Sequence, residues 1–328
     1  MKALLSHEPG GPETLRIDEV PDPAPGPGEL LVRVRACSIN YPDVLIIEDK
    51  YQLKPPRPFA PGSEVAGEVE AIGEGVEGWA PGDRLIAPTG FGGLVEKMVV
   101  PVRMAIPLPP ERTFEEGSAL LLTYATAIHA LVDRGRLASG QSLLVLGAAG
   151  GVGIAAVEIG KALGARVIAA ASSEEKAAAA RESGADSAIV YPTGDLDPRA
   201  LTQLFKDGVG PDGADVIFDP VGGDYAEAAL RSIGWEGRYL VVGFPAGIPK
   251  LPLNLTLLKS CDVCGVFWGA FAAREPKRNA AHVELLFRWW AEGKIAPRVT
   301  ATYPLERAGE AIAALRDRRA VGKLVVTI

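Results

Sequence analysis

Between residues 125 and 268 the chain alternates short apolar runs with longer amphipathic stretches. The apolar runs lack internal polar alternation, a pattern typical of parallel strands that are covered on both faces. Six of them predict strands, over 143–147, 166–171, 187–191, 215–218, 238–242 and 262–267. The stretches between them predict helices over 174–182, 198–206, 224–233 and 253–259, with Gly184 and Gly208 near C-terminal ends. This order predicts an α/β fold built on a doubly wound parallel sheet.

The first 110 residues have a different pattern, in which proline and glycine residues separate brief β-branched runs such as 30–35 and 65–69. Such punctuation predicts an antiparallel, β-rich domain. The last strand-like run, 323–328, has no glycine loop of its own, so we expect it to complete that first domain. The predicted organisation is one domain of residues 1–122 and 269–328, and a second of residues 123–268.

A glycine-rich turn follows the first of the six predicted strands. It matches A-x-G-x-x-G through Ala148, Gly150 and Gly153, so the usual first glycine is absent. A helix to about residue 163 and a second strand follow, with Gly164 expected as a left-handed helix cap. This context predicts a dinucleotide site, whose pyrophosphate would meet the start of the helix, at Ala149, Gly150, Gly151 and Val152. A glycine-rich turn of another kind of α/β protein is the alternative.

Composition narrows the class of protein. The 328 residues carry a net charge of −7 without a basic cluster, which argues against nucleic acid as a main partner. No apolar run has transmembrane length and no leader is evident, so we expect a cytoplasmic protein without a membrane partner. Three cysteines do not form a disulfide framework. Cys261 and Cys264 lie three apart on a predicted strand and are expected as small buried apolar residues.

Several segments in this order resemble a known family. They are 38–43 (SINYPD), 61–67 (PGSEVAG), 123–127 (TYATA), the glycine turn, 218–223 (FDPVGG) and 321–324 (VGKL). Over essentially its whole length the chain resembles the medium-chain dehydrogenase/reductase superfamily, in its zinc-independent quinone oxidoreductase (zeta-crystallin-like) branch, and within it the bacterial quinone oxidoreductase-like group. The resemblance implies a Rossmann NADPH-binding domain and an antiparallel β-rich, GroES-like catalytic domain.

Zinc-dependent alcohol dehydrogenases of that superfamily hold catalytic zinc with a cysteine in Cys-x-x-Asp and a histidine in Gly-His-Glu. Here Asn40 and Ser63 take those two positions, and the cysteine-rich structural zinc lobe is also missing. We therefore expect no metal site. Alcohol oxidation needs a Lewis acid to stabilise the alkoxide, whereas a quinone or an enone accepts hydride directly into a conjugated system.

The end of the second predicted strand bears on the choice of cofactor. Ala171 stands where an acidic residue would bind the ribose hydroxyls of NAD. Ser172, Ser173 and Lys176 follow it and suit a 2′-phosphate, as in the family's NADPH pocket. We therefore favour NADPH over NADH, although Glu174 and Glu175 point the other way unless they are ordinary first-turn helix residues.

The resemblance implies further site residues. Asn40, Tyr51 and Thr126 would line the nicotinamide and acceptor pocket, with surface packing as the alternative for Tyr51. His129 stands where a relative has tyrosine and is expected instead as a neutral core histidine bonded to the backbone. The remaining candidate cofactor residues follow strands three, five and six or belong to the C-terminal motif: Tyr191, Gly243, Phe244, Phe267, Trp268 and Lys323.

The function expected from these observations is NADPH-dependent reduction of quinones or α,β-unsaturated carbonyls by direct hydride transfer. The alternatives are an enoyl thioester reductase of the same superfamily, and a non-catalytic NADPH-binding protein. The partner is expected to be a small-molecule quinone or enone, and the resemblance implies a homodimer formed through the sixth strand.

Overall fold

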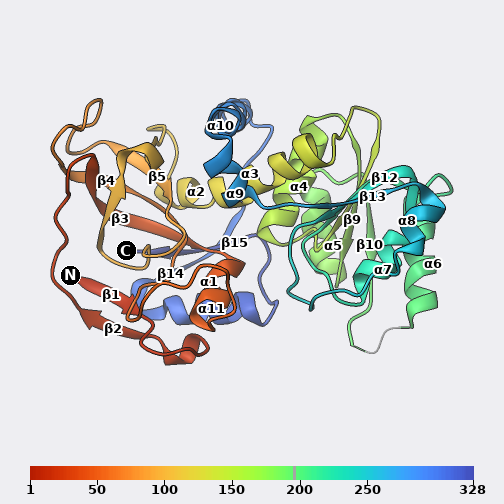
Figure 1. Ribbon diagram of the computed structural model, residues 1–328, viewed down its shortest axis with the longest axis horizontal. Helices are drawn as coiled ribbons and strands as arrows, with labels where there is room; N and C mark the ends of the chain where they lie inside the picture. Colours follow the sequence, from red (N-terminus) through yellow and green to blue (C-terminus); the bar gives the residue numbers. More distant parts are fainter. Residues whose placement is uncertain (195–196) are drawn as a thin grey trace. The chain divides into compact units, whose positions relative to one another are not determined.

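The computed structural model describes residues 1–194 and 197–328 (Figure 1). The chain divides into two compact units, the first of Met1–Leu122 with Pro297–Ile328 and the second of Thr123–Ala296. Residues 269–296 therefore belong to the second unit, which corrects the expected return to the first domain at residue 269. Their helices are α9 (Trp268–Arg274) and α10 (Pro276–Ala291). Phe271 of α9 stacks on His129 with ring centroids 4.0 Å apart, and Arg278 of α10 pairs with Asp133 at 2.7 Å, which ties the segment to the second unit.

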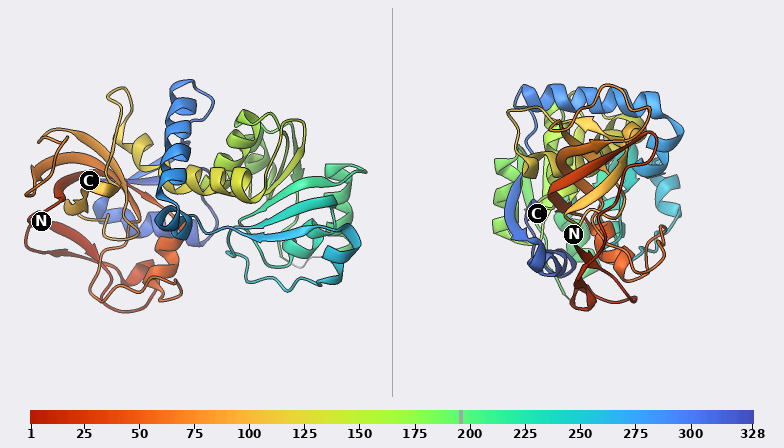
Figure 2. Two further views of the ribbon diagram at one scale, coloured as in Figure 1. Left: turned by 45° about the horizontal axis from the view of Figure 1, so that its top comes forward. Right: turned by 90° about the vertical axis from the view of Figure 1, so that its left-hand side faces the viewer.

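The second unit contains a six-stranded parallel sheet in the order β10-β9-β8-β11-β12-β13. This is the doubly wound Rossmann order, and it confirms the predicted fold class. Figure 2 shows these strands, green to cyan, side by side in its left view. Their bounds are β8 (Ser142–Leu146), β9 (Arg166–Ala171), β10 (Ser187–Val190), β11 (Ala214–Asp219), β12 (Ile233–Val241) and β13 (Asp262–Gly265).

Both faces of this sheet are covered, as the unbroken apolar runs require. A Cβ placed on Gly160 of α4 (Gly151–Ala162) would lie 2.7 Å from a methyl group of Leu143, so this helix packs closely on one face. Leu144 points to the opposite face and shares a core with Phe205 and Tyr225. That face is covered by α6 (Pro198–Val209), α7 (Tyr225–Leu230) and α8 (Asn254–Lys259).

Most predicted boundaries hold within a few residues. The helix α5 (Glu174–Glu182) has the predicted bounds, and Gly164 has the predicted left-handed backbone at φ +82°. The helix α6 ends at Val209 with Gly210 as its cap, so Gly208 lies near its C-terminal end as predicted, although the helix extends beyond the predicted residue 206. The helix α3 (Leu121–Ile128) begins at the end of the first unit and lies mostly in the second. It continues as a π-helix over His129–Arg134, which the sequence pattern did not predict.

The first unit is built on a seven-stranded sheet. Its C-terminal strand β15 (Lys323–Thr327) pairs antiparallel with β3 (Glu29–Ile39), so the chain end returns to this domain as predicted. The sheet is mixed rather than purely antiparallel, because β14 (Val299–Pro304) and β15 are parallel and are joined across helix α11 (Ala308–Arg316).

The other strands of the first unit are β1 (Lys2–Leu5), β2 (Arg16–Glu19), β4 (Glu64–Ile72), β5 (Arg84–Pro88), β6 (Lys97–Pro101) and β7 (Ile106–Pro107). Its other helices are α1 (Tyr41–Ile47) and α2 (Phe114–Ser118), with short 3-10 turns at Pro12–Thr14, Val102–Met104 and Leu305–Arg307.

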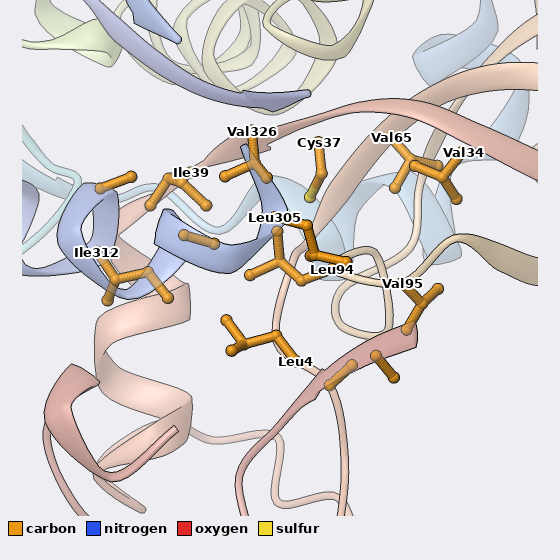
Figure 3. Packing of buried hydrophobic residues seen from close by; sticks show 14 of the residues in the cluster. Leu4, Val34, Cys37, Ile39, Val65, Leu94, Val95, Leu305, Ile312 and Val326 are labelled. Atoms are coloured by element: carbon orange, nitrogen blue, oxygen red, sulfur yellow. The ribbon is translucent and has the colours of Figure 1, made fainter. Parts of the chain in front are cut away.

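The core of the first unit joins both ends of the chain. Leu4 of β1 packs in one cluster with Cys37 of β3 and Val326 of β15 (Figure 3). Within the described part of the chain, no helix combines the length and the apolar character needed to cross a bilayer.

Candidate functional site

The glycine turn has the geometry that its sequence pattern predicts. Gly147 leaves β8 with φ +56°, in the left-handed region, and Gly150 is the extended N-cap of α4, which has no side-chain cap. The first amide groups of an α-helix have no partner within the helix, so this N-terminus presents donors to an anion. A Cβ on Gly153 would lie 2.3 Å from the carbonyl oxygen of Gly147, so only glycine allows this close packing.

The end of β9 brings together the residues expected at a 2′-phosphate. Lys176 Nζ donates to Ser172 Oγ over 3.4 Å, and Ser173 Oγ accepts the Lys176 backbone N–H over 3.3 Å as the N-cap of α5. Glu174 forms an ion pair with Arg181 at 2.6 Å and is exposed. Glu174 therefore behaves as an ordinary first-turn helix residue, paired with Arg181 on the surface of α5.

The other predicted cofactor residues of the second unit lie after its strands but have different surroundings. Tyr191 is buried, its ring centroid 4.8 Å from that of Tyr225, so it packs in the core. Gly243 and Phe244 follow β12, and Phe244 is exposed. Phe267 follows β13 and is also exposed, whereas Trp268 begins α9 and donates its indole N–H to Asn279.

In the first unit, a cluster of buried polar side chains surrounds Asn40. Asn40 directly follows β3 and is the N-cap of α1, and its backbone N–H donates to Asp43 Oδ2 over 2.7 Å. Asp43 Oδ2 also accepts the hydroxyl of Ser63 at 3.2 Å, and its Oδ1 accepts the Gly62 N–H. The Asn40 side-chain amide lies 3.4 Å from Ser63 Oγ, so the two positions that differ from the zinc enzymes are neighbours.

Lys323 supplies the positive charge of this cluster. Its Nζ donates to Asn40 Oδ1 over 2.5 Å and to the carbonyl of Ile39, and it lies 3.9 Å from Glu64 Oε2. Glu64 also accepts the Ser38 hydroxyl and a backbone N–H. Lys323 is only 4% exposed, so its ammonium is engaged inside the first unit.

Burial dominates the protonation behaviour of these groups. It raises the pKa of Asp43 to about 6 and raises the pKa of Glu64, while the nearby Lys323 ammonium partly opposes both shifts. Burial lowers the pKa of Lys323, and the Glu64 and Asp43 carboxylates oppose that shift. Sequence reasoning did not single out either carboxylate as a functional residue, although both lie within the segments that carry the family resemblance.

Three further residues that the sequence singled out, Tyr51, Thr126 and His129, lie in different surroundings. Tyr51 is half-buried against the core of the first unit, and burial and the Asp43 charge raise its pKa. Thr126 is half-buried on α3 in the second unit, so its proximity to Asn40 stays a prediction. His129 bonds to the Asp133 carboxylate at 2.7 Å and not to the backbone as expected, because the two residues lie four apart along one helical segment and their side chains are neighbours.

Comparisons with known proteins cover both units. A family model described as alcohol dehydrogenase GroES-like domain matches residues 26–110, and one described as zinc-binding dehydrogenase matches residues 151–284. Quinone oxidoreductase-like protein 2 of Bos taurus is 35% identical, covering 96% of this chain and 89% of that protein. The synaptic vesicle membrane protein VAT-1 homolog of Homo sapiens is 33% identical, covering 97% and 84%.

Among solved structures, Escherichia coli quinone oxidoreductase complexed with NADPH superposes with a TM-score of 0.91 at 28% identity, covering 100% of both chains.

The donor atoms around Asn40 do not fit the zinc that one matching description names. Zinc in proteins is held by thiolate, imidazole or carboxylate groups. Here Asp43 and Glu64 accept hydrogen bonds from protein donors, and the Lys323 ammonium lies where it would repel a dication. Across residues 1–194 and 197–328, no group of three or more His, Cys, Asp or Glu side chains is arranged to hold a metal.

Proposed function

Because the chain belongs to the medium-chain dehydrogenase/reductase family, among its quinone oxidoreductase-like proteins, we propose that it is an NADPH-dependent reductase of quinones or α,β-unsaturated carbonyls. The observation that carries the proposal is a pair of features suited to binding anions, which follow the carboxyl ends of the neighbouring strands β8 and β9. They are the helix N-terminus at Gly150 and the Ser172–Lys176 pair at the end of β9.

The residues of the second unit would hold the pyrophosphate and the 2′-phosphate of NADPH separately. The backbone N–H groups of Gly151 and Val152 would bind the pyrophosphate, and no Cβ at Gly150 obstructs its approach. Lys176 and Ser172 would bind the 2′-phosphate through charge-assisted hydrogen bonds. When bound, the nicotinamide supplies the hydride that the acceptor receives.

In the first unit, Asn40 would form a polar wall of fixed orientation for the acceptor. Its Oδ1 is held by Lys323 and its Nδ2 donates to Ser63 and Ser38, so both ends of the amide are fixed. Tyr51, with a raised pKa, remains a phenol at neutral pH and can donate a hydrogen bond. An acceptor that is already electrophilic needs such orientation rather than a Lewis acid.

The test is steady-state oxidation of NADPH by a 1,4-naphthoquinone, a cyclic enone and an enoyl-CoA, each with and without a strong chelator. The proposal predicts turnover of the quinone or the enone, unchanged by the chelator. Turnover of the enoyl-CoA alone would replace it with an enoyl thioester reductase. Tight NADPH binding without any turnover would indicate a binding protein.

We also propose a homodimer formed through β13, the edge strand of the parallel sheet. Val263 on this strand is 41% exposed, and the N-cap of α8, Leu253, is 76% exposed. Within α8, Leu257 and Leu258 are 78% and 62% exposed. Such apolar exposure beside an open strand edge favours pairing with a second copy. Sedimentation should show a dimer that Leu257→Glu weakens, whereas a wild-type monomer at micromolar concentration would refute this proposal.

A further inference from the structure

We propose that Asp219 is a positioning residue of the dinucleotide site, holding the turn after β11 against the glycine turn after β8. The inference rests on the proposed NADPH function and extends it to a residue that would not touch the cofactor. β8 and β11 are neighbours at the point where the order of strands reverses. In open α/β sheets the ligand crevice lies at this point, outside the carboxyl ends of the strands.

The Asp219 carboxylate is enclosed by donors. Its Oδ1 accepts the backbone N–H of Val221 at 2.7 Å and of Gly222 at 2.9 Å, and its Oδ2 accepts a short hydrogen bond from the Tyr239 hydroxyl. The residue is 3% exposed. Because both oxygens accept and neither donates, the ionised carboxylate is the form that satisfies all three donors.

This carboxylate fixes a turn with an unusual backbone. Gly222 and Gly223 have φ values of +70° and +57°, in the left-handed region. Without Asp219, the amide groups of Val221 and Gly222 would lose the partner that holds them in this turn. The turn contacts the glycine turn directly, since a Cβ on Gly147 would lie 2.8 Å from a methyl group of Val221.

The same turn is bonded to the loop that follows β12. The Ala246 N–H donates to the Val221 carbonyl at 2.9 Å, and the Gly223 N–H donates to the Gly247 carbonyl at 2.7 Å. The Asp219 carbonyl itself accepts the Val242 N–H at 2.9 Å. The turn that the Asp219 carboxylate holds therefore contacts the chain segments that leave both neighbouring strands, β8 through the Val221 side chain and β12 through backbone hydrogen bonds.

The test compares the affinity of purified variants for NADPH, measured by fluorescence titration, with their free energy of unfolding. Asp219→Ala removes the acceptor, and we expect the Kd for NADPH to rise at least tenfold. Asp219→Asn keeps an oxygen for both N–H groups while its amide faces the Tyr239 oxygen, so its Kd should stay within about threefold of wild type. Tyr239→Phe should raise the Kd by about threefold.

Asp215→Ala is the matched control. Asp215 lies at the opposite end of the same strand, where its Oδ2 accepts the backbone N–H and the hydroxyl of Ser142 at 2.7 Å. Its loss should lower the free energy of unfolding but leave the Kd for NADPH unchanged. A purely structural role for Asp219 would give the same result for Asp219→Ala, with stability lowered and affinity unchanged, and would overturn the proposal.

If Asp219→Ala does not fold, Tyr239→Phe decides, since an unchanged Kd in that variant would also overturn the proposal. If wild-type protein binds no NADPH, the proposed function fails instead, which separates the two failures.

Discussion

Lys323 is the residue on which the polar cluster of the first unit depends. Its ammonium lies 3.9 Å from the Glu64 carboxylate, and both groups are buried. A buried carboxylate that loses its cation is strongly destabilising, because the charge stays desolvated without compensation.

Replacing Lys323 with Met removes the ammonium and keeps a long side chain. We expect the free energy of unfolding, measured by urea denaturation, to fall by about 3–5 kcal/mol. The double variant Lys323→Met/Glu64→Gln should recover part of this loss, because it no longer buries an uncompensated carboxylate. A single variant within about 0.5 kcal/mol of wild type would contradict the role given to this ammonium.

The raised pKa of Asp43 predicts how the free energy of unfolding depends on pH. Its pKa is about 6 in the folded protein and about 4 in an unfolded chain, so the folded state binds more protons between these values. The contribution of Asp43 to the free energy of unfolding therefore falls most steeply as the pH rises from about 4 to about 6, and becomes constant above about pH 7.

The Asp43→Asn variant isolates this contribution. The free energy of unfolding of wild type minus that of the variant should fall by about 2 kcal/mol between pH 4 and pH 6, out of about 3 kcal/mol in total for the two-unit shift in pKa. Urea denaturation at a series of pH values measures it. A difference that is constant over the window, or that rises with pH, would contradict a raised pKa.

At the scale of elements, the glycine turn and the helix after it allow packing and binding to be separated. A Cβ on Gly150 would have only an ordinary contact, 3.4 Å from the Gly147 carbonyl oxygen, whereas a Cβ on Gly153 would clash with backbone atoms. The two positions should therefore respond differently to alanine.

We expect Gly150→Ala to keep the free energy of unfolding within about 0.5 kcal/mol of wild type but to weaken NADPH binding about tenfold, because its Cβ would meet the phosphates. Gly153→Ala, by contrast, should lower the free energy of unfolding by about 1–3 kcal/mol, because its Cβ would clash with the backbone of the turn. Gly265→Ala is the control, since a Cβ there has no neighbour within 4 Å. Equal NADPH affinity in Gly150→Ala and wild type would refute the pyrophosphate site.

The local pattern predicted the elements whose character is set along the chain. The unbroken apolar runs gave the six parallel strands, and the position of Ser173 before a run of helix formers marks the start of α5. The first half of β12 was missed, because Gly234, Glu236 and Gly237 interrupt its apolar pattern and Glu236 has φ +56°. In that half only Ile233 pairs with β11, opposite Ala214, and a register shift separates this pair from Arg238 opposite Val216, an irregularity that no local pattern records.

In the candidate site, too, contacts between residues close in sequence were predictable and contacts between distant residues were not. Ser172 and Lys176 lie four residues apart, so their proximity follows from the start of one helix. Asn40 and Lys323 are 283 residues apart and meet because β15 pairs with β3, with Leu324 opposite Ile39. The sequence therefore indicated that both residues matter, but only the sheet register shows that they bind each other.

For the whole molecule, the two-unit organisation follows from the change in pattern near residue 122, whereas the second boundary does not. The segment 269–296 is helical and has no strand pattern of either unit, and it belongs to the second unit through its contacts. At this scale the proposed function depends on the second unit, which would bind a phosphorylated nicotinamide dinucleotide.

The most direct measurement is an equilibrium titration of the wild-type protein with NADPH and, separately, with NADH. The account predicts that NADPH binds at least tenfold more tightly, and that Lys176→Met removes most of this preference while leaving the affinity for NADH unchanged. Equal affinity for the two dinucleotides, or no binding of either, would contradict it.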